Sequence, residues 1–172
     1  MNKKIKLIFP LLLLFLFTEV SSSDDKQKSF NDHQVSFHTG MFDFSDDGKK
    51  AGLFGFQHQN VSLNRNSFLG NLSPITGFII TEDNAGYLYT GVQADYKIGS
   101  INFTPSFTPG YYNKGDGKDL GHSLEFKSEL QFSIDLPLNA QLGFSYNHIS
   151  NASLGSKNPG ANSYMFNFMK QF

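Results

Sequence analysis

Short runs of alternating apolar and polar residues recur along the chain, and this alternation limits the fold more than any other feature. The clearest run covers residues 124–136. One set of alternate positions is mainly apolar and consists of Leu124, Phe126, Ser128, Leu130, Phe132, Ile134 and Leu136. The other set is polar and consists of Glu125, Lys127, Glu129, Gln131, Ser133 and Asp135. Successive side chains of a strand point to opposite faces, so the run predicts a strand with one apolar and one polar face.

The same pattern extends over most of the chain, and turn-forming Gly, Asn, Asp and Pro residues separate the runs. We predict eight antiparallel strands, at residues 34–44, 51–61, 75–83, 86–98, 101–113, 122–136, 140–151 and 162–172. The turns near 99 and 138 are short, whereas the loops near 46, 65–73, 115–120 and 152–161 are longer. Short turns at one end and longer loops at the other are typical of outer-membrane barrels. The connection near 85 is also short, and it is the weakest point of the strand count.

The N-terminus predicts an export signal. Lys3, Lys4 and Lys6 precede an eleven-residue apolar run, 7–17, and small and acidic residues follow at 21–25. This is the order of a cleaved secretory signal peptide. The run is too short to span a membrane, and Pro10 disfavours a buried core helix. We therefore expect residues 1–23 to be a signal peptide and residues 24–172 to form one mature domain.

Composition favours a membrane barrel for that domain. The mean hydropathy is −0.30, which excludes a helical membrane bundle, yet the chain contains 19 Phe and 7 Tyr residues. It contains no Cys, so something other than disulfides has to stabilise an exported domain of this size, and a closed hydrogen-bonded barrel would suffice. The net charge of −1 gives no sign of nucleic-acid binding. The predicted fold is all-β: an eight-stranded antiparallel transmembrane β-barrel of the bacterial outer membrane.

The last strand supports this prediction. Tyr164, Phe166, Phe168 and the terminal Phe172 share one face, as in the terminal strand by which outer-membrane barrels are recognised for assembly. The main structural alternative is a soluble lipocalin-like barrel. That barrel would place its apolar face inside and would not be expected to end on such a strand.

Three polar side chains are expected on the lipid-facing wall. His148 and Ser150 are two positions apart, so they share a strand face with Phe144 and Tyr146. Asn162 shares a face with the aromatic residues of the last strand. Polar groups facing hydrocarbon are costly unless they pair or lie at the membrane interface. The simplest interpretation is that they mark the end of the apolar band. If both termini are periplasmic, strand parity places them at the extracellular end.

A longer string of residues suggests chemistry at this place. It comprises 148–152 (His-Ile-Ser-Asn-Ala), 158–160 (Asn-Pro-Gly) and 163–164 (Ser-Tyr), together with 119–128, 105–107 and 110–112. This string resembles the signature of the lipid A 3-O-deacylase (PagL-like) family. The resemblance spans roughly residues 86–172, whereas the first three strands match only in general barrel character.

The resemblance implies an outer-membrane esterase that removes an ester-linked acyl chain from lipid A of lipopolysaccharide. Ser150 matches the nucleophile, His148 the base that activates it, and Asn151 a position that helps form the oxyanion hole. Asn162 falls at the position of the acid that orients the base. Lipopolysaccharide is then the expected partner, and a homodimer is left open. His33, His38, His58 and His122 lack metal-ligand spacing, so neither a metal nor another cofactor is expected.

The chain departs from the family pattern at two positions. Asn162 is not an acid; its carbonyl can accept the imidazole N–H, but it cannot offset the charge of an imidazolium. Asp116 or Asp119, on a loop expected at the same end, could substitute for the missing acid. Ser153 stands where the family tends to have Gly. The alternative function is a non-catalytic barrel, either a degenerate deacylase relative or a surface-binding protein of the small adhesin type.

Overall fold

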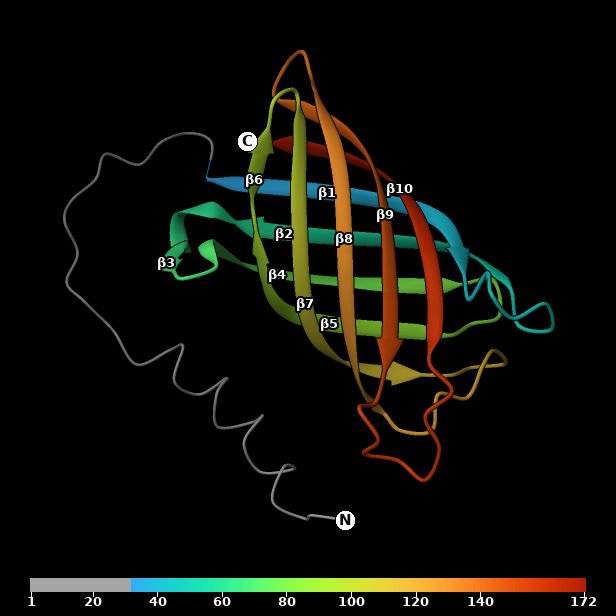
Figure 1. Ribbon diagram of the computed structural model, residues 1–172. Helices are drawn as coiled ribbons and strands as arrows, with labels where there is room; N and C mark the ends of the chain where they lie inside the picture. Colours follow the sequence, from blue (N-terminus) through green and yellow to red (C-terminus); the bar gives the residue numbers. More distant parts are fainter. Residues whose placement is uncertain (1–31) are drawn as a thin grey trace.

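The computed structural model describes residues 32–172, and these form a β-barrel (Figure 1). The predicted signal peptide lies outside the described residues. The eight long strands are β1 (His33–Phe42), β2 (Ala51–Asn60), β4 (Gly70–Thr81), β5 (Gly86–Ala94), β7 (Ile101–Asn113), β8 (Leu124–Leu136), β9 (Ala140–Ser150) and β10 (Ala161–Gln171). Short elements are the 3₁₀ helix η2 (Val61–Leu63), β3 (Arg65–Ser67) and β6 (Tyr96–Ile98). Within residues 32–172 no helix has the length and apolar character needed to cross a bilayer.

Antiparallel pairing closes the barrel. The strand order is β2-β1-β10-β9-β8-β7-β5-β4, and an additional β2–β4 pairing joins the two ends of this sheet. β6 continues β5 along the same neighbour, β7, so the two together occupy one position in the wall. At the seam between the first and last strands, the N–H of Phe172 donates to the carbonyl of His33 at 2.8 Å. The predicted eight-stranded antiparallel barrel is confirmed.

The barrel carries most of its large apolar side chains outside. Phe132 and Phe166 are 50% and 56% exposed, and most other large apolar side chains of the strands also lie on the outer wall. The interior holds buried polar residues, including Glu129, Asn147 and Asn167. Lys127 is completely buried, pairs with Glu129 and lies 4.3 Å above the ring of Tyr89. This arrangement suits a hydrocarbon surrounding and is the reverse of a soluble lipocalin-like barrel.

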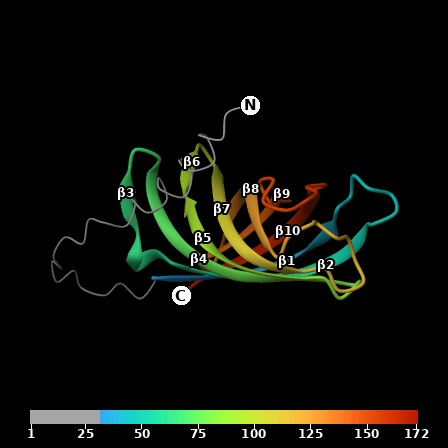
Figure 2. The ribbon, with the colours of Figure 1, turned by 90° about the horizontal axis from the view of Figure 1, so that it is seen from below.

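Four connections meet at one end of the barrel, which we call the loop end: 43–50, 82–85, 114–123 and 151–160. Hydrogen bonds join them to each other and to the strand ends, such as Gly52 N to Glu82 Oε2 at 2.9 Å and Asp116 N to Asp83 O at 2.9 Å. The opposite end carries 61–69, 99–100 and 137–139, so β3 and the β1–β2 loop lie far apart (Figure 2). The short connection near 85 therefore belongs to the loop end, and the count of eight strands holds.

One predicted loop is wrong. Residues 65–73 were expected as a loop before a strand starting at 75, but β3 and the start of β4 form a hairpin here, and it lies opposite the loop end. Pro74 lies in this early part of β4. The ladder between β4 and β2 ends at Ile75, so the missing N–H of Pro74 interrupts no bond on that side, while pairing to β5 continues to Leu72.

Candidate active site

His148 and Ser150 lie on the outer wall where β9 reaches the loop end. His148 is exposed and stands between Ser128 of β8 and Asn162 of β10 in the sheet register. Ser150 is half-buried and is the last residue of β9. The flanking residue Ile149 is completely buried, so the alternation places His148 and Ser150 on the same outward face. The expected convergence with Asn162 is therefore present in the structure.

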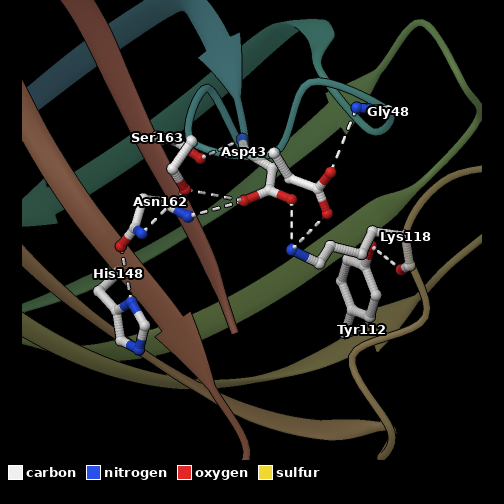
Figure 3. A network of polar contacts seen from close by, with 9 residues as sticks. Asp43, Gly48, Tyr112, Lys118, His148, Asn162 and Ser163 are labelled. Carbon is white, nitrogen blue, oxygen red and sulfur yellow. Dashed lines mark hydrogen bonds and ion pairs between the residues drawn. The ribbon is translucent and has the colours of Figure 1, made fainter. Parts of the chain in front are cut away.

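The carboxamide of Asn162 contacts the imidazole directly. Asn162 Oδ1 lies 2.8 Å from His148 Nδ1 (Figure 3). It also accepts a hydrogen bond from the Tyr146 hydroxyl at 2.8 Å. Asn162 Nδ2 donates to Ser45 Oγ at 3.0 Å. With its oxygen toward the ring, the amide accepts the proton of Nδ1–H, and the neutral imidazole then has its lone pair on Nε2. A base facing the neighbouring serine requires that tautomer.

Ser150 Oγ makes no hydrogen bond within residues 32–172. Residues two apart on a strand are separated by about 7 Å between Cα atoms, so His148 and Ser150 can approach each other only along the surface of the wall. Catalytic hydrogen bonds are often long in ligand-free structures and shorten when substrate binds. The geometry brings the three side chains to one place: His148 contacts the Asn162 amide, and no hydrogen bond joins His148 to Ser150.

Asn151 is placed differently from the other three residues. Its side chain is completely buried, and Nδ2 donates to the carbonyls of Leu120 at 2.8 Å and Lys157 at 2.9 Å. Its backbone N–H donates to Asn158 Oδ1 at 3.0 Å. Both donors are thus used in holding the β9–β10 loop. Asn158, from the Asn-Pro-Gly string, acts here as a tether for the residue after Ser150, a role that the sequence did not reveal.

Two other donors follow Ser150. Ala152 and Ser153 have left-handed backbone conformations, with φ values of 51° and 63°, and both residues are exposed. Their N–H groups make no hydrogen bond to the residues that the structure describes. Unpaired N–H groups beside a nucleophile are suitable for binding an oxyanion. A Gly at 153 would adopt this conformation without strain, so Ser153 is tolerated at some cost in backbone energy.

An acidic residue lies behind Asn162, but it is neither Asp116 nor Asp119, the two named above as able to substitute for the missing acid. Asp116 accepts from Asn84 Nδ2 at 3.1 Å. Asp119 pairs with Lys157 at 3.0 Å; the Lys157 hydrogen bond and the Gly121 N–H together lower the pKa of the Asp119 carboxyl. Asp43, at the end of β1, is instead the acid beside the site: Asp43 Oδ1 accepts the backbone N–H of Asn162 at 3.3 Å.

Asp43 belongs to a charged cluster that joins the β1–β2 loop to the connection 114–123. It is buried and forms an ion pair with Lys118 through Oδ2, as Figure 3 shows. Lys118 also lies 3.3 Å from Asp46. The Gly48 N–H, and after it Lys118, lower the pKa of the Asp46 carboxyl. No group of three or more metal-binding side chains occurs among the described residues.

Gly160 gives the imidazole of His148 its space. A Cβ at residue 160 would lie 2.8 Å from His148 Cε1 and 3.2 Å from Nε2, and φ of Gly160 is +64°. We expect Gly160→Ala to displace the ring and to lower kcat of the ester hydrolysis predicted from the sequence about tenfold or more, because small misplacements of a catalytic group are costly. The matched control is Gly99→Ala, at φ +63° with nothing within 4 Å of the new Cβ. Equal activity of the two variants would contradict the placement of His148.

Comparison with known families and structures decides what kind of barrel this is. A family model described as lipid A 3-O-deacylase (PagL) matches residues 22–171. The chain belongs to the lipid A 3-O-deacylase (PagL) family. The match includes the first three strands, beyond the part of the chain in which the sequence showed a specific resemblance. A search of curated proteins found no significant match.

Solved structures agree with the PagL-family fold. The crystal structure of the outer membrane enzyme PagL is 18% identical, covers 81% of this chain and 99% of its own, and gives a TM-score of 0.61. A de novo designed transmembrane β-barrel, 12% identical, covers 86% and 99% with a TM-score of 0.57. Neisserial surface protein A, 11% identical, covers 81% and 96% with a TM-score of 0.51. This PagL-family member is a barrel of the bacterial outer membrane, as the sequence predicted.

Proposed function

We propose that this protein hydrolyses an ester-linked acyl chain of lipid A, with Ser150 as nucleophile, His148 as general base and Asn162 as the acceptor that orients the base. One observation carries the proposal. On the lipid-facing wall of a PagL-family barrel, His148 Nδ1 is held 2.8 Å from Asn162 Oδ1, and Ser150 follows on the same strand face. Polar side chains at such a position serve a purpose other than contact with lipid.

The chemistry is a two-step acyl transfer. His148 Nε2 takes the proton of Ser150 as Oγ attacks the ester carbonyl, and the resulting oxyanion is bound by the N–H groups of Ala152 and Ser153. The lipid A oxygen leaves with the proton that His148 returns, and the acyl chain stays on Ser150. Water then attacks the carbonyl of this ester as it gives a proton to His148. His148 returns this proton to Ser150 Oγ as the bond between Oγ and the acyl carbon breaks, which regenerates Ser150 and releases the fatty acid.

The outer wall below the site suits an acyl chain. Phe44 packs against Tyr146 and Tyr164, with ring centroids 6.2 Å and 5.5 Å apart, so aromatic rings lie directly beside the Asn162 amide. Farther from the loop end, the same wall has a shallow apolar groove of about 370 Å³. It is lined by Ile101, Phe132, Ser133, Ile134, Leu142, Gly143, Phe144 and Phe166. A substrate whose ester lies at the membrane interface and whose chain enters the hydrocarbon layer would follow this surface.

Hydrolysis by the purified protein tests the proposal. The protein in detergent micelles is mixed with lipid A, and released hydroxy fatty acid is measured by mass spectrometry. We expect steady release from the native chain and none above background from the His148→Ala, Ser150→Ala double variant. Both preparations must show the same β-sheet circular dichroism. A folded native protein that releases no fatty acid would overturn the proposal and favour the non-catalytic barrel.

A further inference from the structure

Resting on the proposed function, we infer that Asp43 and Ser45 are positioning residues for the esterase site: they fix the direction of the Asn162 amide and supply the negative charge that Asn162 lacks. The two residues lie on the β1–β2 loop, more than 110 positions before Asn162 in the chain. Neither reaches His148 itself, so both act through Asn162.

The amide of Asn162 could in principle face His148 in either direction. With the oxygen toward the ring, it accepts from Nδ1–H and leaves Nε2 as the base. With the NH₂ group toward the ring, it would donate to Nδ1, and the ring proton would lie on Nε2, the wrong tautomer for taking a proton from Ser150. A carboxylate has no such ambiguity, since both of its oxygens are acceptors. An Asn at this position therefore needs something that selects one direction.

The direct partners of the amide cannot select it. The Tyr146 hydroxyl contacts Asn162 Oδ1 at 2.8 Å, and Ser45 Oγ contacts Asn162 Nδ2 at 3.0 Å. Each hydroxyl can donate or accept, so each could serve a flipped amide equally well. His148 can change tautomer and is equally ambiguous. The direction of the amide has to be set by a group that can only donate or only accept a hydrogen bond.

Asp43 is that group. Ser45 Oγ lies 3.5 Å from Asp43 Oδ1, and an ionised carboxylate only accepts. The Ser45 proton therefore points to Asp43, which leaves a lone pair of Ser45 for the Nδ2–H of Asn162. The Asn162 carbonyl then faces Nδ1–H of His148. In this series of hydrogen bonds every donor points toward Asp43. Nε2 of His148 is left free to act as the base.

The cluster also has the charge that the site requires. His148 becomes positive when it takes the serine proton, and a nearby negative charge stabilises it. Asp43 and Asp46 share one cation, Lys118, so these three groups carry a net charge of −1. The other residues in contact with the imidazole or the amide, Tyr146 and Gly160, add no charge when Tyr146 is protonated.

The backbone holds Asp43 in this position. Its φ of 49° is a left-handed conformation, which Asp adopts more readily than most residues. The turn lets Phe44 N donate to Asn162 O at 2.9 Å, while the Asp43 side chain accepts from Asn162 N at 3.3 Å. Both the backbone N–H and the backbone carbonyl of Asn162 are thus bound by residues 43 and 44.

The tautomer of His148 tests the inference without any assay of activity. Protein labelled with ¹⁵N-histidine is measured in micelles at alkaline pH, and His148 is assigned by its loss in His148→Gln. We expect the Nδ1–H tautomer in the native chain and a mixture with Nε2–H in Asp43→Asn and Ser45→Ala. Ser45 is exposed, so we expect Ser45→Ala to fold. It therefore provides the test if Asp43→Asn fails to fold. A native Nε2–H tautomer, or one that neither variant changes, would overturn the inference.

A double-mutant cycle of Asp43→Asn with Asn162→Asp, measured by enzyme kinetics, tests the inference independently. In the native background we expect Asp43→Asn to lower kcat about tenfold with KM unchanged, the size of effect of one lost hydrogen bond to a charged group. In the Asn162→Asp background no amide needs orienting, so Asp43→Asn should lower kcat less than twofold. An equal loss in both backgrounds would show that Asp43 only stabilises the fold.

Asp47→Asn is the matched control for the cycle. Asp47 lies on the same loop, its substitution changes the charge equally, and its partner is Lys50 rather than Asn162. It should leave the tautomer and kcat unchanged in both backgrounds; a loss equal to that of Asp43→Asn would overturn the positioning role. The absence of acyl release by the native chain would refute the proposed esterase, whereas the tautomer would still decide the roles of Asp43 and Ser45.

Discussion

Ser150→Ala is expected to reduce kcat for lipid A ester hydrolysis by about 10⁴-fold, because the acyl-enzyme cannot form without Oγ. The expected loss is smaller than the ~10⁶-fold effect of removing the serine from an enzyme with a full carboxylate triad, since Asn162 gives this site a lower starting rate. KM should change little, because the hydroxyl contributes little to lipid binding. Initial rates of fatty acid release from purified protein in micelles measure both constants.

Ser153→Ala is the matched control for this substitution. Ser153 lies three residues after Ser150 on an exposed turn, and its side chain makes no hydrogen bond to the described part of the chain. Its backbone N–H, which we assign to the oxyanion, remains in Ser153→Ala. Activity should therefore stay within about threefold of the native rate, a shift of less than 1 kcal/mol in the barrier. Retention of most activity in Ser150→Ala would remove Ser150 from the mechanism.

Asn162→Asp is expected to raise kcat by about 10- to 100-fold, because a carboxylate would then contact the imidazolium directly. Asp has the size of Asn, so an oxygen stays near the 2.8 Å position now held by Asn162 Oδ1. The rise is limited because the native amide already selects the correct tautomer. The same purified assay measures this, with Asn158→Asp as a control for added charge near the loop.

The size of this rise in kcat distinguishes the two orientations of the Asn162 amide. Loss of the correct tautomer in a serine-protease triad costs about 10⁴ in rate. A rise of about 10⁴ in Asn162→Asp would therefore mean that the native amide presents its NH₂ group to His148, against the arrangement in Figure 3. A fall in kcat would show that the carboxamide itself is needed, and His148 would then have a role other than a base assisted by an acceptor.

The barrel could be predicted from sequence because its signal is local. Alternation within one run, such as 124–136, determines which side chains face lipid, and this requires no knowledge of distant residues. The side of each connection follows from strand parity, which placed His148 and Asn162 at the same end. The hairpin at 65–72 was missed because Pro74 and its polar neighbours mimic a loop, and only the pairing partners show that a ladder forms there.

The site was only partly predictable for the same reason. His148, Ser150 and Asn162 lie on adjacent strands, so their faces could be read from alternation. Asp43 and Ser45 come from the other end of the chain and reach Asn162 only because β1 pairs with β10. Barrel closure was itself a prediction, and it could have directed attention to the residues that follow the first strand. The burial of Asn151 depends on the conformation of the β9–β10 loop. The alternation of apolar and polar residues does not predict the conformation of a loop.

Mass spectrometry of lipid A, extracted from bacteria that express the full chain, tests most directly whether this barrel removes an acyl chain from lipid A by means of Ser150. We expect lipid A lighter by one hydroxyacyl group in cells with the native chain, and unmodified lipid A in cells with Ser150→Ala inserted at equal level. Unmodified lipid A in both strains, or the same loss in both, would contradict this expectation.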